Sequence, residues 1–196
     1  MKIKWMLMIA ALLSALSAGS VIAQQATQTP ELQQAGATAL LQDAKGNNVG
    51  QVTFSQRADG KVVIIGQFNG LTPGFHGFHI HSVGQCDATS TPPFASAGKH
   101  FNPGSTQHPD HAGDLPLILI NGDGTGETET VTDRFKLADL FDSDGSSVVI
   151  HADPDNYANI PARYAAQPDA QTLDNGDSGD MIACGVIQQD AEPTAG

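Results

Sequence analysis

Histidine is the residue type whose number and spacing in this chain most clearly indicate chemistry. Six of the seven histidines lie between positions 76 and 111, and the seventh, His151, ends a short run of apolar residues. A single histidine is usually a hydrogen-bonded core or surface residue, but neutral imidazole is a very common protein ligand for zinc and copper. The cluster therefore predicts a transition-metal site.

His79 and His81 are two positions apart in a segment with strand character, so their side chains point to the same face of the strand. Together they would form a two-point site for a metal ion. His76 has the opposite parity. We therefore do not assign it as a ligand, and we expect it to make a supporting or structural hydrogen bond.

Three more histidines and one carboxylate follow in a long, proline-containing stretch: His100, His108, His111 and Asp114. Three imidazoles and a carboxylate match the ligands of a closed tetrahedral zinc site. Pro103 and Pro109 would stiffen the loop that presents these side chains. The sequence thus predicts a zinc site on this stretch.

The segments that must position these residues are short and rich in β-branched and aromatic residues. We expect about eight strands, at residues 37–42, 49–55, 62–69, 75–83, 115–120, 127–132, 147–151 and 182–187. Glycine-containing turns separate many of them, which is typical of an all-β barrel or sandwich. Two long stretches, 84–114 and 152–181, interrupt the pattern, and connections of that length are usually functional. A short helix is predicted at 135–141.

Composition limits the class of protein further. The 196 residues carry a formal charge of −12, and the sequence pI is about 4.6. Such an acidic chain is a poor candidate for a nucleic-acid binder, whose affinity depends on lysine and arginine at the phosphates. The length fits one domain and leaves little room for a second.

The first 23 residues have the pattern of a secretory signal peptide. Lys2 and Lys4 precede an uncharged stretch that ends in small residues before Gln24. The alternative is an uncleaved membrane anchor, since 19 uncharged residues are long enough to span a bilayer. Cleavage predicts a periplasmic or secreted protein without a membrane association, and takes the formal charge from −12 to −14. We then expect a flexible leader at 24–35, one domain at 36–190 and a short tail at 191–196.

An oxidising compartment allows the two cysteines, Cys86 and Cys184, to form one intramolecular disulfide. The alternative is two separate buried thiols. A disulfide closing so long a loop stabilises the fold by up to about 4–5 kcal/mol in the chain-entropy model.

Residues 36–187 resemble the secreted copper/zinc superoxide dismutases of bacterial type. Five motifs carry the resemblance, in order: GFHIH at 77–81, HFNP at 100–103, HPDHAGD at 108–114, VIH at 149–151 and ACGVI at 183–187. The resemblance implies an eight-stranded Greek-key barrel. It also implies an enzyme that converts superoxide to dioxygen and hydrogen peroxide, and it leaves open whether the protein is a monomer or a homodimer.

The resemblance also assigns the site residues. It implies a catalytic copper ion held by His79, His81, His100 and His151, and a zinc ion held by His100, His108, His111 and Asp114. His100 would bridge the two ions. Asp155 matches a carboxylate that links a copper histidine to a zinc histidine, here His79 and His108. Cys86 and Cys184 match the disulfide of the family.

One position departs from the family pattern. The family has an arginine three residues before the second disulfide cysteine, where its charge attracts the anionic substrate, whereas this chain has Met181. Arg163 is the first candidate for a substitute cation, ahead of Lys99, Arg134 and Lys136. We therefore expect a weakened or salt-insensitive dismutase. The alternative is a copper/zinc-binding protein for metal buffering or delivery on the same fold.

Overall fold

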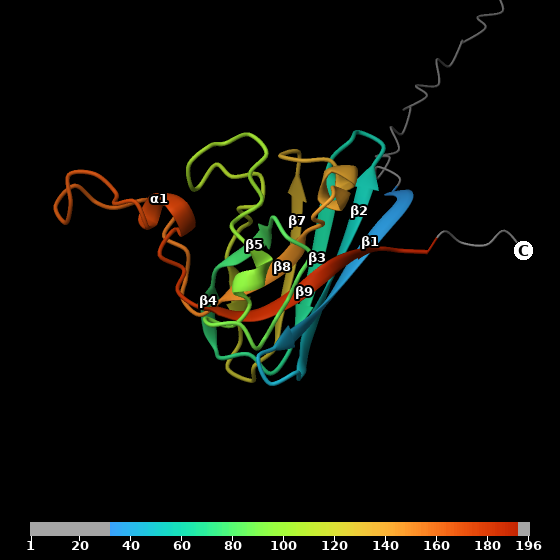
Figure 1. Cartoon of the computed structure of the whole chain (residues 1–196), viewed down its shortest axis with the longest axis horizontal. Coiled ribbons are helices and arrows are strands. Elements are labelled where there is room, and N and C mark those ends of the chain that lie inside the picture. The colour runs from blue at the N-terminus through green and yellow to red at the C-terminus, as the bar shows by residue number, and fades with distance from the viewer. Residues whose placement is uncertain (1–31, 192–196) are drawn as a thin grey trace, which may run out of the picture.

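A computed structural model describes residues 32–191 of the chain (Figure 1). The predicted signal peptide, most of the leader and most of the tail lie outside these residues. The described residues form nine strands: β1 Leu32–Asp43, β2 Asn48–Arg57, β3 Val62–Phe68, β4 Gly74–His76, β5 Phe78–His81, β6 Ile118–Ile120, β7 Gly126–Thr132, β8 Ser147–His151 and β9 Met181–Gln189. They also include two short 3-10 helices, η1 Ala95–Ala97 and η2 Leu137–Phe141, and a single-turn helix α1, Thr172–Asn175.

Seven of the strands form one antiparallel sheet in the order β5-β8-β9-β1-β2-β3-β7, and β4 and β6 form a small second sheet. The larger sheet curves into a half-barrel (Figure 1). Its strands are joined partly by crossover connections, as in Greek-key folds. The predicted all-β fold is confirmed.

Alternation of apolar and polar residues explains how the sheet encloses its core. In β2, Val52 and Phe54 are buried while Thr53 between them is half-buried, as a strand with one core face requires. Across the barrel, Phe78 and Ile80 of β5 are fully buried in the same cluster. Since strand residues alternate between faces, burying these two turns His79 and His81 toward the other side of the sheet.

The predicted strand at 75–83 is instead two strands that belong to different sheets. The break falls at Gly77, whose N–H donates to the carbonyl of Asp153 and whose carbonyl accepts from the N–H of His151, both at 2.9 Å. A Cβ at this position would lie 2.8 Å from the Ser178 side chain and 3.2 Å from the His79 ring. Because the chain changes sheet at a glycine, its backbone can pass close to the histidines. The alternation of residue types in the sequence does not show this change of sheet.

Several other boundaries differ from the prediction. β1 begins at Leu32, inside the predicted flexible leader, and β9 extends to Gln189. The strand expected at 115–120 begins only at Ile118, because Pro116 has no N–H to donate to a sheet. The helix expected at 135–141 is the shorter η2, which the carboxylate of Asp139 caps by accepting from the N–H of Lys136 at 2.7 Å.

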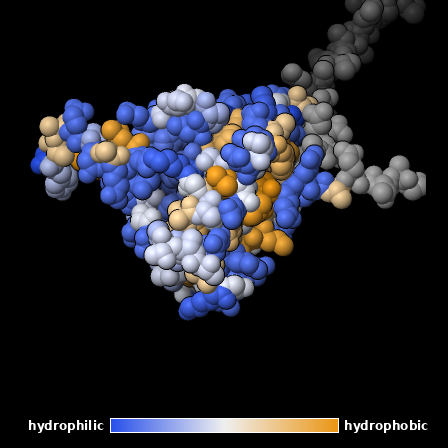
Figure 2. All heavy atoms as spheres, viewed as in Figure 1, coloured by the Kyte–Doolittle hydropathy of each residue, from blue (hydrophilic) through white to orange (hydrophobic). Residues whose placement is uncertain are grey.

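Both long connections hydrogen-bond to the segment that carries His79 and His81: the N–H of Ser82 donates to the carbonyl of Lys99 at 2.8 Å, and the N–H of Gly77 donates to that of Asp153 at 2.9 Å. The connection that contains α1 projects from the body of the molecule (Figure 1). Hydrophilic residues cover most of the face shown in Figure 2, with smaller hydrophobic areas between them. Within residues 32–191, no helix has the length and apolar character needed to cross a membrane.

Candidate metal centre

Neighbouring strands bring the first four histidines together. His79 and His81 lie on β5, which pairs with β8, and His151 ends β8. His100 comes from the 84–114 loop and is held against β5 by a β-bridge to His81. All four side chains are buried, and each offers a ring nitrogen within 4.8 Å of the others.

Hydrogen bonds fix which nitrogen of each ring faces the centre of this group. His81 donates from Nδ1 to the carbonyl of Gly98 at 2.9 Å, and His151 donates from Nδ1 to the carbonyl of Gly179 at 3.1 Å. Burial lowers the pKa of His81 well below its usual value and that of His151 to about 3, so both rings are neutral. Their Nε2 lone pairs then face each other at 3.3 Å. Two lone pairs so close repel unless a cation lies between them.

The second group has the spacing of a tetrahedral metal site. Asp114 Oδ1 lies 2.7 Å from His100 Nδ1, and Asp114 Oδ2 lies 3.0 Å from His108 Nδ1. His111 Nδ1 lies 3.4 Å from His100 Nδ1. Zinc bonds of about 2.0–2.1 Å place tetrahedral ligands about 3.3 Å apart. The observed separations scatter around this value, so these donors fit zinc.

His100 belongs to both groups. Its Nδ1 faces Asp114, while its Nε2 is buried and has no hydrogen-bond partner. The Nδ1 atom of His79 is likewise buried without a hydrogen bond, and the neighbour of the buried His108 Nδ1 is the Asp114 carboxylate at 3.0 Å. Buried polar atoms are normally satisfied, and neutral imidazole nitrogens without a partner are suitable donors for copper and zinc. The residues present therefore fit two metal ions that share one imidazole.

A buried carboxylate, that of Asp155, forms hydrogen bonds with one histidine of each group. Asp155 accepts from Nε2 of His79 and from Nε2 of His108, each at 2.8 Å, and all three side chains are fully buried. Burial raises the pKa of Asp155, but the bonds from His108 and His79 outweigh it and hold this pKa well below its usual range. The carboxylate thus remains ionised and leaves the Nδ1 lone pair of both rings free for a metal.

His76 lies outside both groups, and its ring sits between the carbonyl oxygens of His151 and Thr72, at 2.7 and 2.8 Å. It therefore links β4 to the backbone of His151, a member of the first histidine group.

Cys86 and Cys184 form the predicted disulfide, with their Cα atoms 5.6 Å apart. It ties the 84–114 loop to β9. The cysteines pack with Phe94, Ala97 and Val149 in a small apolar cluster.

A cavity of about 200 Å³ opens onto the first histidine group. Met181 lies at this opening, half-buried and paired with His151 across β9 and β8. Lys99 also lines it, with Nζ 2.7 Å from Asp174, and Asp180 lies beside them.

The expectation that Arg163 replaces the missing arginine is not supported by its position. Arg163 is exposed, lies over the ring of Tyr164 at 4.7 Å, and is not among the residues that line the opening. Lys99 is instead the cation among the described residues that line the opening. It directly precedes His100, and that adjacency is the sequence signal that could have identified it.

Fold and site together define an all-β protein with two adjoining, buried sets of side chains that fit metal ions. The family model for copper/zinc superoxide dismutase matches residues 48–187. The chain therefore belongs to the copper/zinc superoxide dismutase family, with its copper and zinc ligand sets intact.

Several relatives carry the name copper/zinc superoxide dismutase. The protein from Mycolicibacterium paratuberculosis is 45% identical over 131 residues, which cover 60% of this chain and 57% of that protein. The Mycobacterium tuberculosis protein is 44% identical and is covered to 54%. The chain thus spans little more than half the length of these relatives. The Deinococcus radiodurans protein is 38% identical over 162 residues, with 76% of this chain and 81% of that protein covered.

Among solved structures, the crystal structure of the clock protein EA4 has the same fold. It superposes with a TM-score of 0.63 at 29% identity, covering 83% of this chain and 96% of that one.

Proposed function

We propose that this protein converts two superoxide anions and two protons into dioxygen and hydrogen peroxide. Copper would be held by His79, His81, His100 and His151, and zinc by His100, His108, His111 and Asp114. The observation that carries the proposal is the shared ring of His100. Its unpaired, buried Nε2 belongs to the copper set while its Nδ1 belongs to the zinc set.

Copper bound at such a site can accept an electron from one superoxide and return it to a second, which zinc cannot do because it has no redox chemistry. The protein residues supply position and protons. His100 can take a proton at Nε2 and give it up again while its Nδ1 stays in the zinc set. Asp155 keeps the rings of His79 and His108 in one tautomer.

The charges around the opening to the copper set support slow capture of the superoxide anion. Met181 brings no charge to it, Asp180 is exposed beside it, and the charge of Lys99 is compensated by Asp174. A local positive potential can raise the association rate of an anion by about 10–10³-fold. We therefore propose a dismutase whose turnover is limited by this weak attraction.

A metal-carrying function is the second candidate, and the same methionine favours it. A thioether is a soft ligand that suits Cu(I), and Met181 lies beside His151 at the surface of the copper set. A copper buffer or delivery protein would use this position to accept or release the ion.

An assay that compares copper-loaded, zinc-only and metal-free protein tests the proposed activity. Superoxide from an enzymatic source is followed by its reduction of cytochrome c. The proposal expects competition that scales with copper content and disappears in the zinc-only protein. If the copper-loaded protein does not compete but hands Cu(I) to a chelator, the metal-carrying function is supported instead.

We further propose that the chain is exported and that residues 1–23 are then removed. The charged start, the apolar centre and the small residues before Gln24 support this proposal. Mass spectrometry of the protein from the periplasmic or extracellular fraction would find an N-terminus near Gln24. An intact Met1 in the membrane fraction would instead support an uncleaved anchor.

A further inference from the structure

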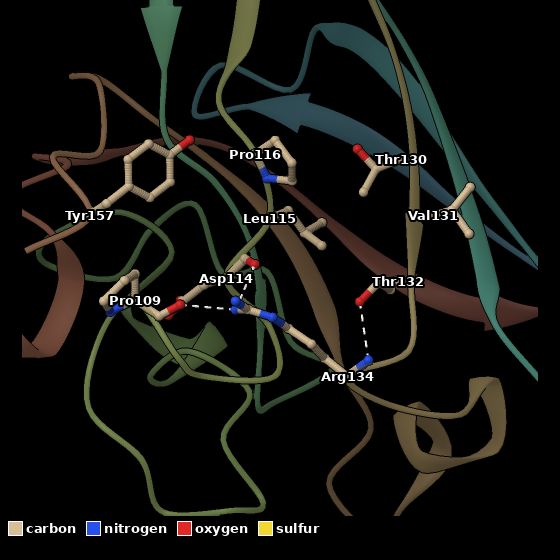
Figure 3. A pocket seen from close by; sticks show the side chains of 9 residues that line it. All are labelled: Pro109, Asp114, Leu115, Pro116, Thr130, Val131, Thr132, Arg134 and Tyr157. Carbon is tan, nitrogen blue, oxygen red and sulfur yellow. Dashed lines mark hydrogen bonds between the residues drawn. The ribbon is translucent and has the colours of Figure 1, made fainter.

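Arg134 reaches from the end of β7 to the loop that carries the zinc ligands. Its Nη1 donates to the carbonyl oxygens of Pro109, His111 and Asp114, at 2.9, 3.1 and 3.4 Å. Figure 3 shows the side chain extended toward this loop. Two of the three carbonyls belong to zinc ligands.

The loop is attached differently on its two sides. On the β5 side, the backbone of Gly113 accepts from Ile80 at 2.9 Å and donates to Phe101 at 2.8 Å. On the β7 side, a cavity of about 440 Å³ lies between the loop and the sheet, lined by Leu115, Val131 and Tyr157 among others (Figure 3). Leu115 packs into the hydrophobic core at one wall of this cavity, and Arg134 hydrogen-bonds from the β7 side to the backbone of His111 and Asp114.

The charge of Arg134 is directed at the carbonyls rather than at a close carboxylate. The nearest acidic contact is Asp110, 3.9 Å from Nη2 and largely exposed. Hydrogen bonds from a charged donor are about twice as strong as neutral ones. The guanidinium thus fixes the backbone on both sides of the His111–Asp114 turn, in which the N–H of Asp114 donates to the carbonyl of His111 at 3.2 Å.

We propose that Arg134 is a positioning residue for zinc. By holding the carbonyls of His111 and Asp114, it keeps their donor atoms at tetrahedral spacing and slows the opening of the loop that releases the ion. The inference needs the proposed dismutase function only for its effect on turnover; its effect on zinc is independent of that function.

The test is zinc release from the protein loaded with both metals, measured with a colorimetric chelator in excess. Mutating a residue that orients a metal ligand typically costs 10–100-fold in metal affinity, so we expect Arg134→Ala to release zinc about 10–100 times faster. Copper release should not change. When cobalt(II) replaces zinc in Arg134→Ala, the visible absorption bands of tetrahedral cobalt should be weaker than in the parent protein. Arg134→Lys, which keeps the charge but not the planar fork, should be intermediate.

Lys136→Ala is the matched control. Lys136 lies two residues along and also donates to a backbone carbonyl, that of Gly60 at 3.0 Å, but this carbonyl is in a hairpin turn away from the metals. Zinc release from Lys136→Ala should equal that of the parent.

Equal zinc release from Arg134→Ala and Lys136→Ala would overturn the inference. So would an equal acceleration of zinc and copper release together with a lower unfolding temperature of the metal-free protein, since that indicates a general structural role. If Arg134→Ala does not fold, Arg134→Lys is judged by the same criteria. A parent that lacks dismutation but still shows selective zinc loss on substitution would refute the proposed function and leave this inference standing.

Discussion

Replacing Asp155 by asparagine should break one of its two hydrogen bonds to the metal-site histidines and so weaken the binding of at least one metal ion. The carboxylate accepts from Nε2 of His79 and from Nε2 of His108. An asparagine of the same shape offers one oxygen and one NH2 group. The oxygen can accept from one histidine, but the NH2 group would face the N–H of the other, so one ring must turn or change tautomer.

The size of the effect follows from these two contacts. Each is a 2.8 Å bond to a charged acceptor with both partners fully buried. A hydrogen bond to a charged group contributes about 1.5–3 kcal/mol, which corresponds to about 10–100-fold in a binding constant. We therefore expect Asp155→Asn to weaken at least one metal by about 10–100-fold.

Competition with chelators of known affinity would give the dissociation constant of each metal separately. Asp153→Asn is the control, because Asp153 lies two residues earlier and is exposed. Dissociation constants for Asp155→Asn within about threefold of those for Asp153→Asn would refute the role assigned to Asp155.

Three further variants test other parts of the site. Met181→Arg should raise dismutation by about tenfold or more and make the rate fall with added salt, as measured by stopped-flow superoxide decay; an unchanged rate and salt profile would contradict the role given to Met181. Gly176→Ala should weaken zinc binding, because the new Cβ would overlap the Asp155 carboxylate and the His108 ring, whereas Gly46→Ala, also at positive φ but in open space, should lose only about 1 kcal/mol of stability. Replacing both Cys86 and Cys184 by serine should lower the free energy of unfolding by about 2–5 kcal/mol in urea titrations, and a loss below about 1 kcal/mol would contradict a stabilising disulfide.

Local sequence patterns predicted much of the fold and the metal ligands because both follow short-range periodicity. The two-residue spacing of His79 and His81 placed them on one face, and the alternation around Val52 and Phe54 marked a strand with one core face. Metal ligands also have distinctive residue types, so the 84–114 loop could be assigned to zinc without knowing its path.

Contacts between distant segments could not be predicted in this way. The change of sheet at Gly77 depends on close contacts with Ser178 and His151, which lie about 100 and about 75 positions further along the chain. The pairing of Lys99 with Asp174 and the reach of Arg134 to the zinc loop are likewise long-range contacts of exposed, unremarkable cations. Their roles emerge only when the three-dimensional arrangement is known.

Decay of superoxide after pulse radiolysis, followed with the chain loaded with copper and zinc, tests the proposed activity most directly. The expected result is decay proportional to copper content, at a rate below the diffusion limit of about 10⁹ M⁻¹s⁻¹, that does not fall as ionic strength rises. Decay that is independent of copper would contradict the dismutase function. A rate near the diffusion limit that falls steeply with salt would contradict the weak anion attraction assigned to the Met181 opening.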